Sequence, residues 1–240
     1  MQVKELFGKK NVYCTAVVLA AGSSSRMGSD KMLMSLGGIP VLARTLLAFE
    51  HSGDINDIIV VTRDENVEKI AELCARFKVS KVKKVIAGGN TRMESALAGV
   101  SEAGNKADYI AIHDGARPFV TGALIKRTLA EAQKSYAAIP VVKSVNTLKS
   151  VDESGAVLGT LDRNTVMCAQ TPQIFEADLI RGALTNAVTK GVNVTDDSAA
   201  LEALGIKTQT VEGDDINLKI TTRLDMVIAA AILKDKGSIV

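Results

Sequence analysis

The chain has 240 residues, of which 47% are hydrophobic, and a formal net charge of +2 at pH 7, which is compatible with one large core in a single domain over residues 1–240. Dispersed basic residues, the absence of Trp and an aromatic content of 3% argue against a nucleic-acid partner. The short apolar runs, the polar residues 1–11 and three widely spaced cysteines argue against a membrane partner and a disulfide framework, and favour a cytoplasmic protein.

Short β-branched runs alternate with helical patterns along the chain. The expected strands cover residues 15–20, 57–62, 82–86, 108–112 and 137–142, with another near 207–211. The expected helices cover residues 40–51, 66–77, 91–103, 121–135, 176–190, 196–204 and 222–234. This alternation predicts a Rossmann-like α/β fold, in which a mostly parallel twisted sheet carries helices on both faces. Functional residues in such sheets lie beyond the carboxyl ends of the strands.

Individual residues predict several helix ends. Pro40 suits the first position of a helix, because its fixed φ is helical and its missing N–H is not needed there. Thr91 and Glu94 have the spacing of a capping box. Gly191 and Gly205 fall where the left-handed residue after a helix is expected.

The first expected strand runs into a loop of small residues. The apolar run from Ala16 to Ala21 ends at Gly22, and three serines, Arg26, Gly28 and Lys31 follow. Small residues let backbone N–H groups approach phosphate oxygens, and the cations neutralise the phosphate charge. The loop matches neither the Walker P-loop nor the dinucleotide fingerprint. It predicts a polyphosphate site, and an ordinary strand-to-helix turn is the alternative.

Paired glycines follow the strand at 82–86 and precede the helix that starts near residue 91. Gly88 and Gly89 permit close backbone approach to a flat ligand such as a base. Ser95 would lie one turn into the helix, near its positive end. A flexible turn before a capped helix explains these residues equally well.

The segment His113-Asp114-Gly115-Ala116-Arg117-Pro118 directly follows the strand at 108–112. An Asp at a strand end can hold Mg²⁺ or a substrate hydroxyl, and an Arg nearby can bind a phosphate through two N–H groups. An internal Asp114–Arg117 pair that pins the loop is the alternative, and it is compatible with ligand binding. His113 is expected to be a structural hydrogen-bonding residue, because no nucleophile or orienting acid lies near it in sequence.

Residues 143–170 interrupt the alternation of strands and helices. They hold no long helical period, and residues 151–157 suggest two short strands around a polar turn. Because long structureless loops are uncommon in compact domains, we expect a protruding β-arm or a lid rather than a plain surface loop.

Four further segments carry polar residues near expected strand or helix ends. They are Leu161-Asp162-Arg163, Ala169-Gln170-Thr171-Pro172-Gln173, Thr195-Asp196-Asp197-Ser198 and Gly213-Asp214-Asp215-Ile216-Asn217-Leu218-Lys219-Ile220-Thr221. Taken alone, Thr195 or Asp196 can simply cap a helix, and the last segment can be a solvated charged loop. In this order, and together with the opening loop and the His113–Pro118 segment, they resemble the methylerythritol-phosphate cytidylyltransferase family. The resemblance extends from about Thr15 to about Ala230.

The resemblance implies a role for each of these segments. Catalysis would fall to Arg26 and Lys31, which would grip the triphosphate of CTP. The nucleotide would be bound by Ala20, Ala21, Gly22, Gly88, Gly89, Asn90, Arg92 and Ser95. The sugar-phosphate acceptor would be bound by Asp114, Arg117, Thr171, Thr195 and Lys219, with Thr147 and Arg163 supplied by the arm of a second subunit in a homodimer. Mg²⁺, or another divalent cation, would be held by Asp114 or otherwise through the CTP phosphates.

The implied reaction is attack by an acceptor phosphate oxygen on the α-phosphorus of CTP, with pyrophosphate leaving. The sequence departs from the family pattern in its short spacing between Arg26 and Lys31, and in Asn90 and Asn146, which stand where acids are usual. The short loop resembles that of molybdopterin nucleotidyltransferases. The alternatives are therefore a cytidylyltransferase acting on ribitol 5-phosphate or another polyol phosphate, a molybdopterin nucleotidyltransferase, and an inactive nucleotide-binding regulator.

Overall fold

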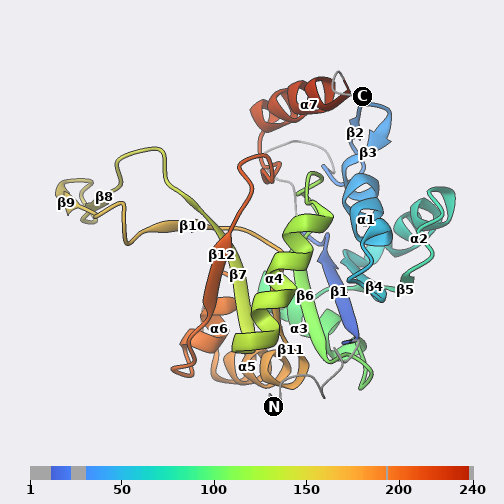
Figure 1. The fold of residues 1–240 in the computed structure, drawn as a ribbon, viewed down its shortest axis with the longest axis horizontal. Helices are drawn as coiled ribbons and strands as arrows, with labels where there is room; N and C mark the ends of the chain where they lie inside the picture. The colour runs from blue at the N-terminus through green and yellow to red at the C-terminus, as the bar shows by residue number, and fades with distance from the viewer. Residues whose placement is uncertain (1–11, 23–30, 193, 238–240) are drawn as a thin grey trace, which may run out of the picture.

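The structure is a computed structural model that describes residues 12–22, 31–192 and 194–237. Its largest element is an eight-stranded sheet in the order β10-β7-β11-β6-β1-β4-β5, with β12 paired to β7 (Figure 1). The strands are β1 (Cys14–Leu19), β4 (Asp57–Thr62), β5 (Val82–Ala87), β6 (Tyr109–Asp114), β7 (Ala137–Lys143), β10 (Met167–Ala169), β11 (Gln173–Glu176) and β12 (Gln209–Glu212).

The predicted strands are all present, and the sheet is mostly parallel as expected. Strands β6, β1, β4 and β5 form a parallel run, and β12 lies parallel to β7. Every residue of β1 and β6 is buried, which explains their near-continuous apolar sequence. The sequence did not predict β10 and β11, which pair antiparallel with their neighbours. Both are short, and β11 begins directly after Pro172 and carries polar residues at both ends.

Helices cover both faces of the sheet. Helices α1, α2 and α4 supply Leu46, Ile70 and Leu124 to the core on one face. Helices α3, α5 and α6 pack on the other face. The helices are α1 (Val41–His51), α2 (Val67–Arg76, after a 3₁₀ turn at Asp64–Asn66), α3 (Arg92–Glu102), α4 (Gly122–Ser135), α5 (Ala177–Lys190), α6 (Ser198–Glu202) and α7 (Arg223–Gly237). Among the described residues, no helix is long and apolar enough to cross a membrane.

Helix α7 lies apart from these two layers, beside a small hairpin of β2 (Ser35–Leu36) and β3 (Ile39–Pro40) (Figure 1). A separate core cluster joins them, with Ala229 of the helix packed near Leu36 and Ile220. This separate cluster therefore holds together α7, the β2–β3 hairpin and the segment around Ile220.

The helix ends test the four local predictions. The capping box of Thr91 and Glu94 is present, and Gly191 is left-handed directly after α5. Two predictions were wrong by a residue or two. Pro40 belongs to β3, where it pairs with Ser35, and α1 begins one residue later. Helix α6 ends at Glu202, so left-handed Gly205 lies beyond its last turn rather than at its C-cap.

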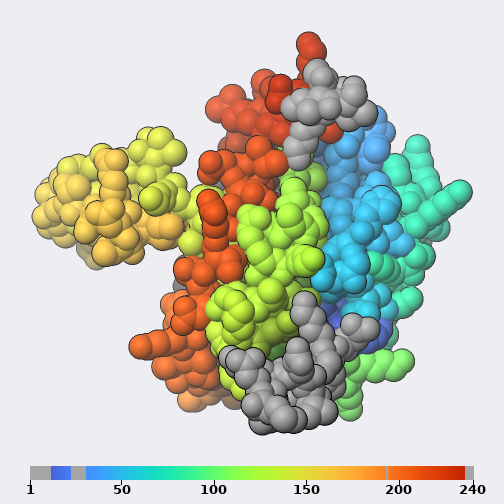
Figure 2. All heavy atoms as spheres, in the orientation of Figure 1, coloured from blue at the N-terminus to red at the C-terminus, as the bar shows by residue number. Residues whose placement is uncertain are grey.

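The expected arm is a hairpin that projects away from the body of the molecule (Figures 1 and 2). Strands β8 (Lys149–Val151) and β9 (Val157–Thr160) pair antiparallel, separately from the main sheet. The Asp152 carboxylate closes the turn by accepting hydrogen bonds from the N–H groups of Ser154 and Ala156, each at 2.9 Å. The arm carries large apolar side chains that are exposed, among them Val157 and Leu158.

Candidate active site

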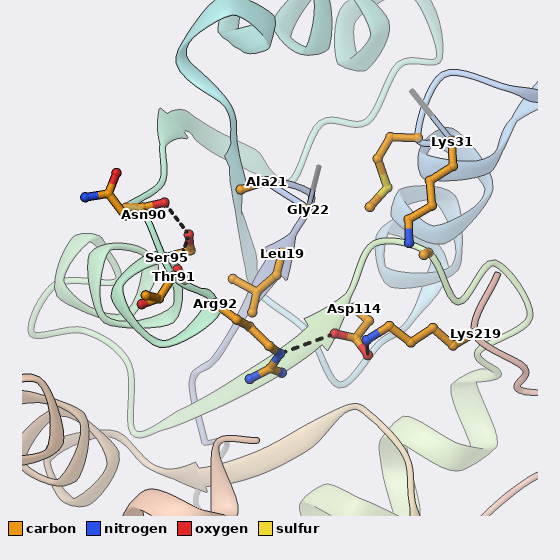
Figure 3. A pocket seen from close by; sticks show the side chains of 13 residues that line it. Leu19, Ala21, Gly22, Lys31, Asn90, Thr91, Arg92, Ser95, Asp114 and Lys219 are labelled. Carbon is orange, nitrogen blue, oxygen red and sulfur yellow. Dashed lines mark hydrogen bonds and ion pairs between the residues drawn. The ribbon is translucent and has the colours of Figure 1, made fainter. Parts of the chain in front are cut away.

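A pocket of about 300 Å³ lies at the carboxyl ends of β1, β5 and β6 (Figure 3). Parallel register brings these ends together, since Leu19 of β1 pairs with Asp114 of β6. The described residues that line the pocket are Leu19, Ala21, Gly22, Lys31, Met32, Gly89, Asn90, Thr91, Arg92, Ser95, Asp114, Ala116 and Lys219. Figure 3 shows Asn90, Thr91 and Ser95 on one side and Lys31 and Lys219 on the other.

The end of β1 supplies the back of the pocket with little more than backbone. Ala21 and Gly22 line it, whereas Ala20 is buried beneath, and its N–H donates to the carbonyl of Val61 at 2.7 Å. Gly22 is the last residue described before Lys31. Arg26, the other predicted catalytic residue, lies outside the described residues.

The wall formed by the start of α3 depends on close packing. Ser95 is buried, and its hydroxyl donates to the carbonyl of Thr91 at 2.9 Å. A Cβ atom on Gly88 would lie 2.5 Å from the Ser95 hydroxyl oxygen, so glycine allows the loop to approach the helix. The Glu94 carboxylate accepts from the N–H groups of Asn90 and Thr91 at 2.6 and 3.1 Å. These two backbone donors are therefore already used.

Three cations surround Asp114 at the end of β6. Lys219 Nζ lies 2.9 Å from Asp114 Oδ2, Arg117 Nε lies 3.4 Å from the same oxygen, and Arg92 Nε lies 3.6 Å from Oδ1. Burial alone would raise the pKa of Asp114, but Lys219, Arg92 and Arg117 outweigh it and hold that pKa well below its usual range. The carboxylate is ionised at neutral pH and fixes the three cationic side chains at the pocket.

Arg92 is held a second time by Asp197, which lies before α6. Both guanidinium ends donate to this buried carboxylate, at 2.9 and 2.7 Å, in the bidentate geometry that Arg favours. Burial alone would lower the pKa of Arg92, but Asp197 and Asp114 outweigh it and raise the pKa. The predicted nucleotide-binding Arg92 is thus joined to the predicted acceptor residue Asp114.

His113 and Thr171 form a buried hydrogen-bonded pair behind Asp114. The Thr171 hydroxyl accepts from the N–H of Asp114 at 3.1 Å, and it lies 3.0 Å from His113 Nδ1. The hydroxyl hydrogen is then directed at Nδ1, and Nε2 donates to the carbonyl of Arg117 at 3.3 Å. Burial lowers the pKa of His113 to about 3, so the ring is neutral and serves as a structural hydrogen-bonding residue.

The predicted site residues that the structure describes fall into three groups. Nine of them line the pocket, while Gly88, Arg117 and Thr171 lie in or behind its walls. Thr195 is exposed near α6 and does not line the pocket. Thr147 and Arg163 are exposed on the arm, which stands away from the pocket of its own chain (Figures 1 and 2).

The sequence analysis gave no role in ligand binding to five residues that the structure brings to the site. Leu19, Met32, Thr91 and Ala116 line the pocket, and Asp197 holds Arg92. Thr91 and Ala116 belong to motifs that the sequence singled out, so their neighbours pointed to them. Asp197 lies 105 residues from Arg92 in sequence, and no local signal pairs the two.

The pocket favours an anionic ligand. Lys31, Arg92, Arg117 and Lys219 gather around it, against the carboxylates of Asp114 and Asp197. A mostly parallel sheet that brings a glycine-rich wall and such a cationic pocket to its carboxyl edge is typical of nucleotide-binding proteins of the Rossmann-like class.

Comparison with known proteins identifies the family. Residues 14–235 match the family model of 2-C-methyl-D-erythritol 4-phosphate cytidylyltransferase. The enzyme of that name from Halalkalibacterium halodurans is 39% identical over 224 residues, which cover 92% of this chain and 97% of the relative. That from Geotalea uraniireducens is 40% identical over 229 residues, with coverage of 93% and 98%. The crystal structure of 4-diphosphocytidyl-2C-methyl-D-erythritol synthase from Anaerococcus prevotii is similar, with a TM-score of 0.84, 30% identity and coverage of 93% and 97%. The chain belongs to the 2-C-methyl-D-erythritol 4-phosphate cytidylyltransferase family.

Proposed function

We propose that this protein transfers CMP from CTP to 2-C-methyl-D-erythritol 4-phosphate and releases pyrophosphate, a step of isoprenoid precursor synthesis. Family membership supports this reaction over the polyol-phosphate, molybdopterin and inactive alternatives. The observation that carries it is the cluster of Lys219, Arg117 and Arg92 around Asp114, across the pocket from the glycine-rich wall. Such a pocket can hold two anionic substrates side by side.

The nucleotide occupies the half of the pocket between β1 and α3. Gly89 and Asn90 face the base, and Ser95 lies close to the ribose. Lys31 reaches the pocket from the opposite side. It binds the phosphates, and Arg26 keeps the role that the family resemblance implies. The small residues Ala21 and Gly22 leave room for the phosphates to approach the backbone.

The acceptor occupies the half of the pocket around Asp114. The Asp114 carboxylate accepts hydrogen bonds from acceptor hydroxyl groups, and Lys219 and Arg117 bind the acceptor phosphate. Lys219 is only partly buried, so its amine can serve Asp114 and a ligand at the same time. Thr171 fixes the backbone of Asp114 in this half of the pocket, because its hydroxyl accepts a hydrogen bond from the Asp114 N–H.

The reaction needs no general base. The second pKa of a phosphate monoester is about 6, so the attacking oxygen is already largely ionised at neutral pH. The rate enhancement comes from positioning two anions and neutralising the charge on the departing pyrophosphate. The chain meets this requirement with fixed cations rather than with a titrating side chain, because His113 is buried, neutral and fully hydrogen-bonded.

The described residues do not fit a protein-held magnesium ion. Within residues 12–22, 31–192 and 194–237, no group of three or more His, Cys, Asp or Glu side chains could hold a metal. Asp114, the one carboxylate that lines the pocket in those ranges, is already shared by three cations. Asp114 is therefore a poor magnesium ligand, and of the two predicted sites only the CTP phosphates are retained in this proposal.

The proposal includes a cytoplasmic homodimer in which each arm completes the acceptor site of the other subunit. The exposed apolar side chains of the arm support an interface, since exposed apolar patches mark contact surfaces. The projection of the arm away from the body of its own chain also supports the assignment of Thr147 and Arg163 to the acceptor site of another chain.

Pyrophosphate release from CTP, measured with a panel of acceptors, tests the proposed function. We expect turnover with 2-C-methyl-D-erythritol 4-phosphate and at most slow turnover with ribitol 5-phosphate. Faster release with ribitol 5-phosphate would assign the chain to the polyol-phosphate enzymes. Tight CTP binding without release with any acceptor would instead indicate an inactive nucleotide-binding regulator.

A further inference from the structure

Two buried glutamines flank Thr171 and Pro172 where the chain returns from the arm to the sheet. The exposed fractions of Gln170 and Gln173 are 6% and 1%. A buried carboxamide costs free energy unless its donors and acceptor are paired, so both side chains should have partners. Each has them in a different loop that comes later in the chain.

Gln170 pairs with the loop that follows β12. Its Nε2 donates to the carbonyl of Asp214 at 2.9 Å, and its Oε1 accepts from the N–H of Asp214 at 3.1 Å. The N–H of the preceding Gly213 donates to the carbonyl of Val141 in β7 at 2.8 Å. The side chain of Gln170 thus prolongs the pairing of the β12 strand by one residue, with the same donor and acceptor as a backbone amide.

Two contacts connect this pairing to the pocket. Asn217 Nδ2 donates to the carbonyl of Thr171 at 2.9 Å, and the carbonyl of Asn217 accepts from Arg117 at 2.7 Å. Two residues later the same loop delivers Lys219 to Asp114. Glycine at 213 is part of this arrangement, because a Cβ atom there would lie 2.7 Å from Gln170 Oε1.

Gln173 pairs with the loop that precedes α6. Its Oε1 accepts from the N–H groups of Asp197 and Ser198 at 3.1 and 3.0 Å, and its Nε2 donates to Asp196 Oδ2 at 2.7 Å. These bonds fix the backbone of Asp197, whose carboxylate holds Arg92 at the pocket. A glutamate here would place a second carboxylate against Asp196, so the amide is required.

We propose that Gln170 and Gln173 are positioning residues, which hold Lys219 and Asp197, and through Asp197 also Arg92, at the reacting centre. Neither glutamine lines the pocket. Residues 170–173 thereby position two loops that are distant from each other in sequence. One loop carries Lys219, and the other carries Asp197, which holds Arg92. The inference rests on the proposed function only in taking Lys219 and Arg92 as substrate-binding residues.

Double-mutant cycles test the inference. Gln170→Met removes the amide at nearly constant volume, and we expect the KM for the acceptor to rise about tenfold while the KM for CTP changes less than about twofold. In a Lys219→Ala background the same change should have little further effect, because the side chain that Gln170 positions is gone. Gln173→Met should likewise be redundant with Asp197→Asn in kcat/KM. Gln133→Met, an exposed glutamine in α4, is the matched control and should leave all constants unchanged.

Two results would overturn the inference. Additive effects within each pair would show that the glutamines act independently of Lys219 and Asp197. Equal rises in the KM for CTP and for the acceptor with Gln170→Met would show that Gln170 does not act specifically through the loop that carries Lys219. Thermal melting of each variant guards against unfolding. If Gln170→Met does not fold, Gln170→Asn replaces it, because it keeps a carboxamide but withdraws it from Asp214 by one methylene.

The same variants distinguish an error in the proposed function from an error in the positioning role. If Lys219→Ala and Asp197→Asn themselves leave turnover unchanged, the assignment of the pocket is wrong. If they reduce turnover while the glutamine variants add independent losses, only the positioning role is wrong.

Discussion

Acid destabilisation of this protein should be dominated by His113 in the mildly acidic range. Its folded-state pKa of about 3 lies far below the ordinary value of 6.5, because the ring is fully buried. Between these two pKa values, His113 therefore binds a proton in the unfolded chain but not in the folded chain. The stabilisation is complete above the unfolded pKa and is lost as the pH falls below it.

The magnitude follows from the two pKa values. Lowering the pH from about 7.5 to about 5 should reduce the free energy of unfolding by about 2 kcal/mol through His113 alone. This figure hardly changes if the folded pKa is anywhere below about 4, because the ring is neutral in the folded state at the lower pH in each case. Asp114 behaves differently: its depressed pKa gives stability that is lost only below its ordinary value of 3.8, outside this range.

Urea unfolding of the wild type and His113→Asn at both pH values tests this reasoning. Asn can still accept the hydrogen bond from Thr171 but does not titrate, so it should lose about 2 kcal/mol less than the wild type over the same range. His51→Asn, at the exposed end of α1, is the control for a general histidine effect. Parallel pH curves for the wild type and His113→Asn would refute the assignment.

Three further predictions concern the pocket and its support. Lys31→Ala should lower mainly kcat, by about 2.7–4 kcal/mol in transition-state stabilisation, and full turnover would remove Lys31 from the mechanism. Arg163→Ala should raise the KM for the acceptor more than the KM for CTP. When Arg163→Ala and Lys31→Ala chains are refolded together, turnover should be restored, because one of the two sites in each mixed dimer combines an intact Lys31 with an intact arm. If the arm serves its own subunit, mixing the two variants would restore no turnover. Gly99→Ala should lower the free energy of unfolding by about 1–3 kcal/mol in thermal or urea melts, because the added Cβ atom would collide with Val17 and lie 2.7 Å from Val61 under α3. An unchanged melting temperature would show that the helix can shift freely.

Local patterns were sufficient for most of the fold. The strand at 57–62 and the capping box at Thr91 depend on residues close in sequence, and both were predicted. The strand at 173–176 was missed because its four residues have no resolvable period and its partners lie far away in the chain. A short antiparallel insertion of this kind is determined by tertiary pairing rather than by propensity.

The candidate site was likewise predictable where it depends on local sequence and not where it depends on tertiary contacts. The strand-end rule located Asp114 and the glycine-rich wall, because each follows an apolar run directly. The resemblance grouped Arg117 and Lys219 with Asp114, but it assigned Arg92 to the nucleotide, and no local pattern predicted its ion pair with Asp114. The roles of Gln170 and Gln173 also appear only once the folded loops lie beside them.

The capping box at the start of α3 bears on how the proposed nucleotide site can be oriented. The N-terminus of a helix usually attracts phosphate, because its N–H groups are unpaired and its dipole is positive. Here Glu94 occupies the N–H groups of Asn90 and Thr91 and brings its own negative charge. A phosphate at this wall would meet a carboxylate and used donors, whereas an uncharged base would not. In the proposed mode of binding, this wall would therefore favour the base of CTP and leave the phosphates toward Lys31.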